Sequence, residues 1–180
     1  MTLSHTILIL LCESAQSGYD VSKRFEDSVS CFWKASHQQI YRELSKMEGL
    51  GFVASESIPQ QGKPDKKLYQ ITETGRTELE HWFELSCTPA PIREDLLVKV
   101  LAGSYVPKSI LVKQLEERRA LHQHQLDCYS EKEKTFLDIK DPGEHLTFRY
   151  LTLRRGIRYE SEWVDWCNEV LVTLQAAAKV

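Results

Sequence analysis

Apolar residues near the start of the chain recur every three or four positions, which is the spacing of one buried helix face. This spacing predicts a helix over residues 2–12 and a second, shorter helix that begins after Ser17. The expected inner positions are Leu3, Ile7, Leu10 and Leu11 in the first helix and Val21, Phe25 and Val29 in the second.

A third helix is predicted to begin after Ser36 and to end at Gly49 and Gly51. Ser36 and Gln39 form a capping-box pattern, in which each side chain hydrogen-bonds the backbone N–H of the other residue. The expected buried positions are Ile40, Leu44 and Met47, and a second, polar face contains Gln38, Tyr41, Arg42 and Ser45. A helix anchored on one face, with several kinds of hydrogen-bonding group on the other, meets the requirements for contacting DNA. An ordinary solvated helix face is the alternative.

Residues 52–58 and 67–71 favour strands, and the turn-rich segment 59–66 between them predicts a hairpin with lysines near its tip. Thr72 is the expected cap of a further helix, whose buried face is predicted to contain Leu79, Trp82 and Phe83. Three helices followed by a basic hairpin is the element order of a winged helix-turn-helix domain.

Beyond Pro89 and Pro91, which interrupt any continuous helix, the predicted helices are longer. We expect a DNA-binding domain over residues 1–85, a linker over 86–93 and a helical dimerisation domain over 94–180. The helices of the second domain are expected over 95–102, about 108–137 and about 144–178. The predicted fold class is therefore mainly α with a small β-hairpin, comprising a winged domain and an antiparallel coiled-coil dimerisation domain.

The last predicted helix has two apolar stripes. One is a heptad seam from Leu146 to Leu174 with a single polar interruption at Glu160, and the other contains Phe148, Leu151, Tyr159, Trp163, Trp166 and Val170. One stripe can pack on the chain's own long helix and leave the other for a partner. The residues predicted to form the dimer are Leu153, Ile157, Val164, Trp163, Trp166, Leu171 and Leu174. Arg154, Arg155 and Arg158 form a basic face on the same helix, and we expect them to pair with Glu131, Glu133, Glu160 or Glu162 rather than to form a second nucleic-acid site.

Composition changes this interpretation little. The 180 residues have a net charge of −3, so any contact with nucleic acid must come from a local basic patch. Five widely spaced cysteines favour a reducing, cytoplasmic compartment, where we expect them to pack as small hydrophobic residues. The sequence contains neither a membrane-span pattern nor a catalytic or metal-binding motif, so we expect no enzymatic activity, no metal and no cofactor. His122 and His124, two positions apart on a helix, point in different directions and are not expected to bind one metal.

The candidate DNA-contacting residues follow from the third helix and the hairpin tip. They are Lys34, Ser36, His37, Gln38, Tyr41, Arg42, Ser45, Lys46, Lys63, Lys66 and Lys67. Arginine binds guanine or phosphate, glutamine binds adenine, and lysine pairs with phosphate. The predicted function is sequence-specific binding of double-stranded DNA.

Residues 3–75 resemble the winged domain of the PadR family of transcriptional regulators, and the long variant of that family resembles nearly the whole chain. The matching segments are Gly18–Val21, Phe32–Trp33, Ser36, Gln39–Tyr41, Leu44, Leu50–Val53, Gly62–Pro64, Tyr69–Thr72 and Gly75. The resemblance implies a homodimer that binds an inverted-repeat operator through the third helix and the wing. Some members release DNA on binding phenolic acids or other small aromatics, so it also implies such an effector as a candidate partner, although the sequence has no ligand-specific motif.

Two alternatives remain open at this point. The first is a winged-helix protein-interaction module or co-regulator without independent DNA binding. The second is a regulator that binds a small molecule and whose ligand-free form already binds DNA, as distinct from a regulator that has no ligand. Trp33, Trp163 and Trp166 could line a pocket, but core or dimer packing is the favoured interpretation.

Overall fold

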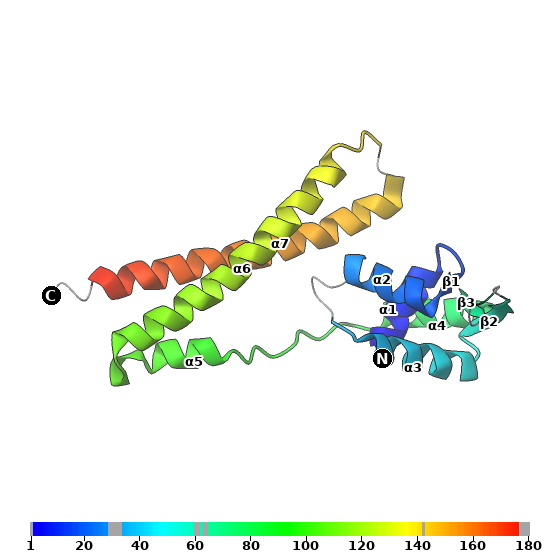
Figure 1. The fold of residues 1–180 in the computed structure, drawn as a ribbon, viewed down its shortest axis with the longest axis horizontal. Coiled ribbons are helices and arrows are strands. Elements are labelled where there is room, and N and C mark those ends of the chain that lie inside the picture. Colours follow the sequence, from blue (N-terminus) through cyan, green and yellow to red (C-terminus); the bar gives the residue numbers. More distant parts are fainter. Residues whose placement is uncertain (1, 29–33, 60–61, 63–64, 142, 177–180) are drawn as a thin grey trace. The chain divides into compact units, whose positions relative to one another are not determined.

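The computed structural model describes residues 2–28, 34–59, 62, 65–141 and 143–176, which form two compact units, Met1–Pro89 and Ala90–Val180. The elements of the first unit are α1 (Thr2–Leu11), β1 (Gln16–Ser17), α2 (Gly18–Ser28), α3 (His37–Gly49), β2 (Val53–Ile58), β3 (Lys66–Ile71) and α4 (Glu73–Glu84). Those of the second are α5 (Asp95–Leu101), the 3-10 helix η1 (Gly103–Tyr105), α6 (Lys108–Leu137) and α7 (Gly143–Ala176) (Figure 1). The predicted fold class is confirmed, with three helices before a β-hairpin and long helices after it.

The core of the first unit is formed by the inner faces of α1, α2 and α3 together with the sheet. Predicted inner positions Leu10, Leu11, Val21 and Phe25 are all buried here, whereas Val29 lies outside the described residues. The other buried members of this core are Ile7, Leu8, Ile40, Leu44, Met47, Val53 and Tyr69.

The sheet has one strand more than the sequence predicted. β2 and β3 pair antiparallel with Ser55 opposite Tyr69, which confirms the hairpin. The additional strand is β1, which pairs with the other edge of β3 and gives the order β1-β3-β2. β1 is only two residues long, so it has no periodicity from which to predict it.

Thr72 joins α4 to the start of β2. Its hydroxyl accepts a hydrogen bond from the Gly75 N–H at 3.1 Å, which confirms the predicted cap, and donates to the Gly51 carbonyl at 2.6 Å. Leu79 packs on the core and Trp82 stacks on the buried His5 ring at 4.6 Å. The prediction that Phe83 is buried is wrong, because that side chain is 70% exposed within the chain. Its ring instead meets the Trp82 ring edge-on, with the centroids 5.3 Å apart.

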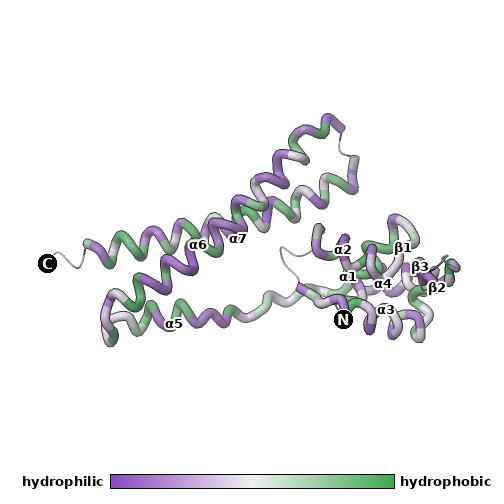
Figure 2. The backbone as a smooth tube through the Cα atoms, in the orientation of Figure 1, coloured by the Kyte–Doolittle hydropathy of each residue, from purple (hydrophilic) through white to green (hydrophobic). Residues whose placement is uncertain are grey.

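In the second unit α6 and α7 run antiparallel and form a helical hairpin (Figure 1). Leu111 and Leu115 of α6 pack with Cys167 and Leu171 of α7 and with Leu96 of α5. Figure 2 shows that apolar and polar segments alternate along both long helices. The predicted heptad seam is therefore buried inside a single chain.

Polar contacts fix the register of this hairpin. Glu160, the predicted interruption of the seam, is buried and lies 2.5 Å from His122 Nδ1 on α6. The His122 ring stacks on Trp163 with the centroids 5.0 Å apart. Arg154 donates to Glu133 at 2.8 Å, as predicted, whereas the Arg155 guanidinium lies over the Tyr159 ring.

The described cysteines differ in their environment. Cys167 is buried in the second core, and this burial raises the pKa of its thiol. Cys12, Cys87 and Cys128 are exposed, so the prediction that they pack as small hydrophobic residues is wrong for these three. Cys31 lies outside the described residues.

The approach of α4 to β2 gives a test of the first unit. A Cβ atom at Gly75 would collide with the backbone carbonyl of Phe52, whereas one at Gly49 would meet nothing within 4 Å. We expect Gly75→Ala to lower the free energy of unfolding by about 1–3 kcal/mol, because backbone atoms cannot move aside as a side chain can. Urea denaturation of both variants checks this. Equal stability of Gly75→Ala and Gly49→Ala would contradict the close packing described here.

Candidate nucleic-acid interface

Helix α3 is fixed at its start and along one face. The Ser36 hydroxyl accepts from the Gln39 N–H at 3.3 Å and the Gln39 side chain accepts from the Ser36 N–H at 2.8 Å, which confirms the capping box. Ile40, Leu44 and Met47 are buried as predicted. Their burial forces the remaining side chains of the helix outward.

The predicted DNA-contacting residues of α3 and its approach are all exposed. They are Lys34, Ser36, His37, Gln38, Tyr41, Arg42, Ser45 and Lys46. Lys46 pairs with Glu43 at 3.3 Å, and His37 Nε2 lies 3.5 Å from Glu26. Among the described residues, Arg42 makes no ion pair, so its guanidinium is available to phosphate or to a base edge.

The hairpin β2–β3 places two of the three predicted wing lysines close to carboxylates. Lys66 pairs with Asp20 of α2 at 3.1 Å, and Lys67 pairs with Glu48 of α3 at 2.7 Å. Both lysine side chains remain about 40% exposed. Lys63 lies outside the described residues.

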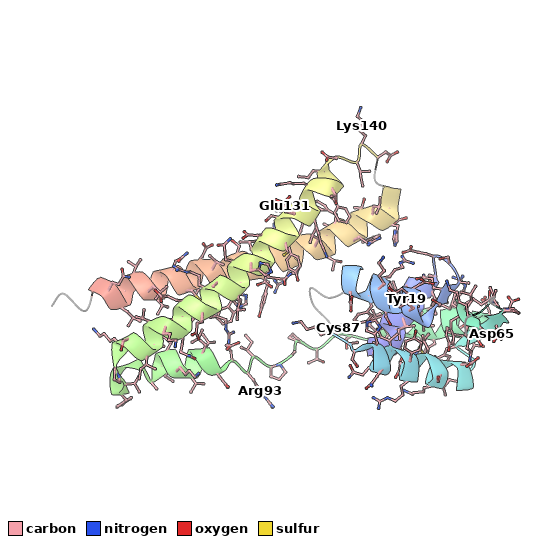
Figure 3. The ribbon with its side chains drawn as sticks, viewed as in Figure 1. Tyr19, Asp65, Cys87, Arg93, Glu131 and Lys140 are labelled. Atoms are coloured by element: carbon pink, nitrogen blue, oxygen red, sulfur yellow. The ribbon has the colours of Figure 1, made fainter. Side chains whose placement is uncertain are left out.

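A groove of about 480 Å³ lies between α2, α3 and the hairpin. Its lining includes three tyrosines and charges of both signs, contributed by Ser17, Gly18, Tyr19, Asp20, Tyr41, Asp65, Lys66, Lys67 and Tyr69. Figure 3 labels Tyr19 on α2 and Asp65 before β3. A Cβ atom at Gly18 would collide with the Tyr41 ring, so glycine allows α3 to lie close to the start of α2. The groove therefore adjoins the outer face of α3.

Hydrogen bonds lower the pKa of the two carboxylates that pair with the wing lysines. Donation from Lys67 and from the Ser55 hydroxyl lowers the pKa of Glu48. Donation from the Ser17 hydroxyl, followed by that from Lys66, lowers the pKa of Asp20. At neutral pH the wing lysines are thus adjacent to full negative charges.

Sequence reasoning missed Tyr19, Asp20 and Glu48 as members of this surface. The Gly18–Val21 segment contributed only to the family resemblance, whereas Glu48, three residues after Ser45, continues the polar face of the helix and could have been placed there by its spacing. Nothing in local spacing indicates that Glu48 meets Lys67, 19 residues later in the chain. Only the pairing of the strands brings them together.

The residues predicted to form the dimer fall into two groups. Leu153, Val164 and Leu171 are buried inside the α6–α7 hairpin of a single chain. Ile157 is partly buried, and Trp163, Trp166 and Leu174 pack on the edge of the second core. Phe148 and Leu151 of the other stripe remain 61% and 56% exposed.

Two other kinds of site are missing from the described part of the chain. No group of three or more His, Cys, Asp or Glu residues there could hold a metal ion. None of the helices described combines the length and apolar composition that a membrane span needs.

Comparison with known proteins gives matches along both units. Residues 7–81 match the transcriptional regulator PadR-like family, and residues 92–175 match the virulence activator alpha C-terminal family. The chain is 40% identical to the "Probable transcriptional regulator" of Mycobacterium tuberculosis, over 97% of this chain and 98% of that protein.

Solved structures extend the similarity to the fold. The Vibrio cholerae virulence activator AphA matches with a TM-score of 0.81 and 32% identity, over 97% of this chain and 99% of that one. Bacillus subtilis PadR in complex with operator DNA matches with a TM-score of 0.84 and 25% identity, over the same shares. That Bacillus protein has also been solved with p-coumaric acid. By its sequence identity to a full-length relative, its two family matches and its fold, this chain belongs to the PadR-like family of transcriptional regulators.

Proposed function

We propose that the protein is a homodimeric transcriptional regulator that binds an inverted-repeat operator in double-stranded DNA. The observation that supports this most directly is α3, whose apolar face is buried while Gln38, Tyr41 and Arg42 face solvent beside a lysine-bearing wing. Bacillus subtilis PadR, whose fold matches over nearly the whole chain, has been solved with operator DNA. We assign it no catalytic activity and place it in the cytoplasm, where the chromosome is.

Each proposed contact has a chemical role. Arg42 can donate two hydrogen bonds to guanine or pair with phosphate, and Gln38 can bind adenine. Tyr41, Ser45, Lys34 and the wing lysines are suited to phosphate oxygens, which fix the position of α3 without contributing sequence information. Two such surfaces in a dimer are expected about one helical turn of DNA apart, roughly 34–36 Å.

Arg42→Ala tests the DNA-contacting face. We expect it to weaken operator binding by about 1–3 kcal/mol for each half-site, because it removes one charged base or phosphate contact from each chain of the dimer. The operator is obtained by incubating the purified protein with sheared genomic DNA from its own organism and sequencing the retained fragments. Arg76→Ala, on α4 of the same unit, removes an equal charge away from α3 and the wing and is the matched control.

Equal binding by the Arg42→Ala variant and wild type would disprove the assignment of α3. Failure of the folded wild-type dimer to bind DNA at low salt would favour the protein-interaction module.

The proposed dimer uses the part of the second apolar stripe that the α6–α7 hairpin leaves uncovered, since Trp163, Trp166 and Val170 of that stripe pack on the second core. Phe148 and Leu151 are exposed on α7, and Tyr159 lies further along the same stripe. An exposed apolar row of this kind on a long helix is typical of an interaction surface. We propose that the same row of a second chain covers it, while the buried seam residues support the helix from behind.

Two variants separate these roles. Leu151→Asp is expected to give a folded monomer, because it places a charge on the exposed stripe only. Leu171→Asp is expected to unfold the second unit, at a cost of about 3 kcal/mol or more, because it buries an unpaired charge in the hairpin core. Light scattering gives the oligomeric state and circular dichroism the helix content. A stable dimer formed by Leu151→Asp at micromolar concentration would place the interface elsewhere.

A small aromatic effector is the remaining part of the proposal. It is supported by the p-coumaric acid complex of the Bacillus subtilis relative. We expect p-coumaric acid, titrated into the protein–operator complex, to release DNA, with benzoic acid as the control for a non-phenolic aromatic acid. DNA that stays bound at millimolar p-coumaric acid would favour a regulator that does not respond to this class of ligand.

A further inference from the structure

Both wing lysines in the described part of the hairpin already have negatively charged partners without DNA. Lys67 donates to Glu48 at 2.7 Å and Lys66 pairs with Asp20 at 3.1 Å. The two carboxylates belong to α3 and α2, so each pair joins the wing to the helical part of the unit. The carboxylate in such a pair takes up part of the lysine's charge and repels a phosphate that approaches the same ammonium group.

The position of Glu48 argues that its role is not to stabilise the helix. It is the last residue but one of α3, where the helix dipole disfavours a negative charge. Its carboxylate instead accepts hydrogen bonds from Lys67 and from the Ser55 hydroxyl on β2. Asp20 differs, because it also forms a reciprocal cap with Ser17 at the start of α2. Substitution of Glu48 therefore tests the ion pair without also removing a helix cap.

The pairs are exposed enough to exchange partners. Side-chain exposure is 43% for Lys67 and 34% for Glu48, and about 40% for both members of the other pair. Ion pairs this exposed are weak and are screened by salt, so a phosphate can displace the carboxylate. A buried pair would not allow this exchange.

We propose that the carboxylates of Glu48 and Asp20 compete with DNA for the wing lysines. DNA phosphates displace these carboxylates from Lys67 and Lys66 when the wing binds. This inference rests on the proposed DNA-binding function. The competition lowers the affinity for DNA of any sequence, because the displaced carboxylates stay close to the DNA phosphates and repel them. The same carboxylates take up cations from solution once they have lost their lysine partners. It also lowers the number of counterions released on binding, which sets the salt dependence.

The experiment measures binding of the full-length dimer to a random-sequence duplex over a series of salt concentrations. Glu48→Gln keeps the size of the side chain and can still accept from Ser55, but it loses the charge that attracts Lys67. For each wing in contact with DNA we expect about 2- to 5-fold tighter binding at low salt, the range for release from one surface ion pair, and roughly the square of that factor when both wings of the dimer bind. The plot of log affinity against log salt should become steeper by up to about 0.9 per wing, the value for one phosphate contact, and so by up to about 1.8 for the dimer.

Removing any negative charge near DNA reduces repulsion, so a matched variant is needed. Glu56→Gln makes the same chemical change on β2 of the same hairpin, where the side chain is exposed and makes no ion pair among the described residues. It measures the general effect of charge. The gain from Glu48→Gln is expected to exceed that from Glu56→Gln.

A double-mutant cycle with Lys67→Gln isolates the pair itself. In that background Glu48→Gln frees no lysine, so its gain should fall to the level of Glu56→Gln. The proposal is overturned if Glu48→Gln weakens binding, which would make the pair a support that positions Lys67. It is also overturned if the gain equals that of Glu56→Gln or persists without Lys67. If folded wild type binds no DNA at any salt concentration, the proposed function itself fails, which is a distinct result.

Discussion

Burial of Ile40, Leu44 and Met47 is the constraint on which the first unit depends. These three side chains pack with residues of α1 and α2, and their burial leaves α3 only one rotational setting. The groups of α3 proposed to contact DNA, Gln38, Tyr41, Arg42 and Ser45, are exposed as a consequence of that setting. The capping box at Ser36 adds a defined first turn, so the start of the outer face is fixed as well as its direction.

In the second unit the corresponding constraint is burial of the apolar seam of α7. Packing of α7 on α6 within one chain buries the seam residues Leu153, Val164, Cys167 and Leu171. A buried glutamate in such a seam is costly unless it is paired, and His122 supplies that partner from the opposite helix. With the seam occupied, Phe148 and Leu151 are left on the surface, and this division explains why a dimer is expected to form through the second stripe.

Charge on the surface proposed to contact DNA is balanced rather than strongly positive. Lys46, Lys66 and Lys67 each have a carboxylate neighbour, whereas Arg42 makes no ion pair among the described residues. We expect an acidic protein with such a surface to depend more on hydrogen bonds from α3 than on bulk attraction to DNA. The same arrangement makes the wing's contribution depend on exchange of ion-pair partners, which occurs at little cost only near the surface.

Much of this architecture was determined by the sequence itself. Spacing and caps predicted the inner face of α3, the hairpin, the Thr72 cap and the bounds of α6, because these features depend on interactions within a few residues. Tertiary structure alone decided which apolar stripe of α7 is buried, that Phe83 is exposed, that β1 joins the sheet, and that Asp20 and Glu48 meet the wing lysines. These outcomes depend on which distant segments pack together. Helical periodicity identifies a face, but it does not say which neighbour that face will meet.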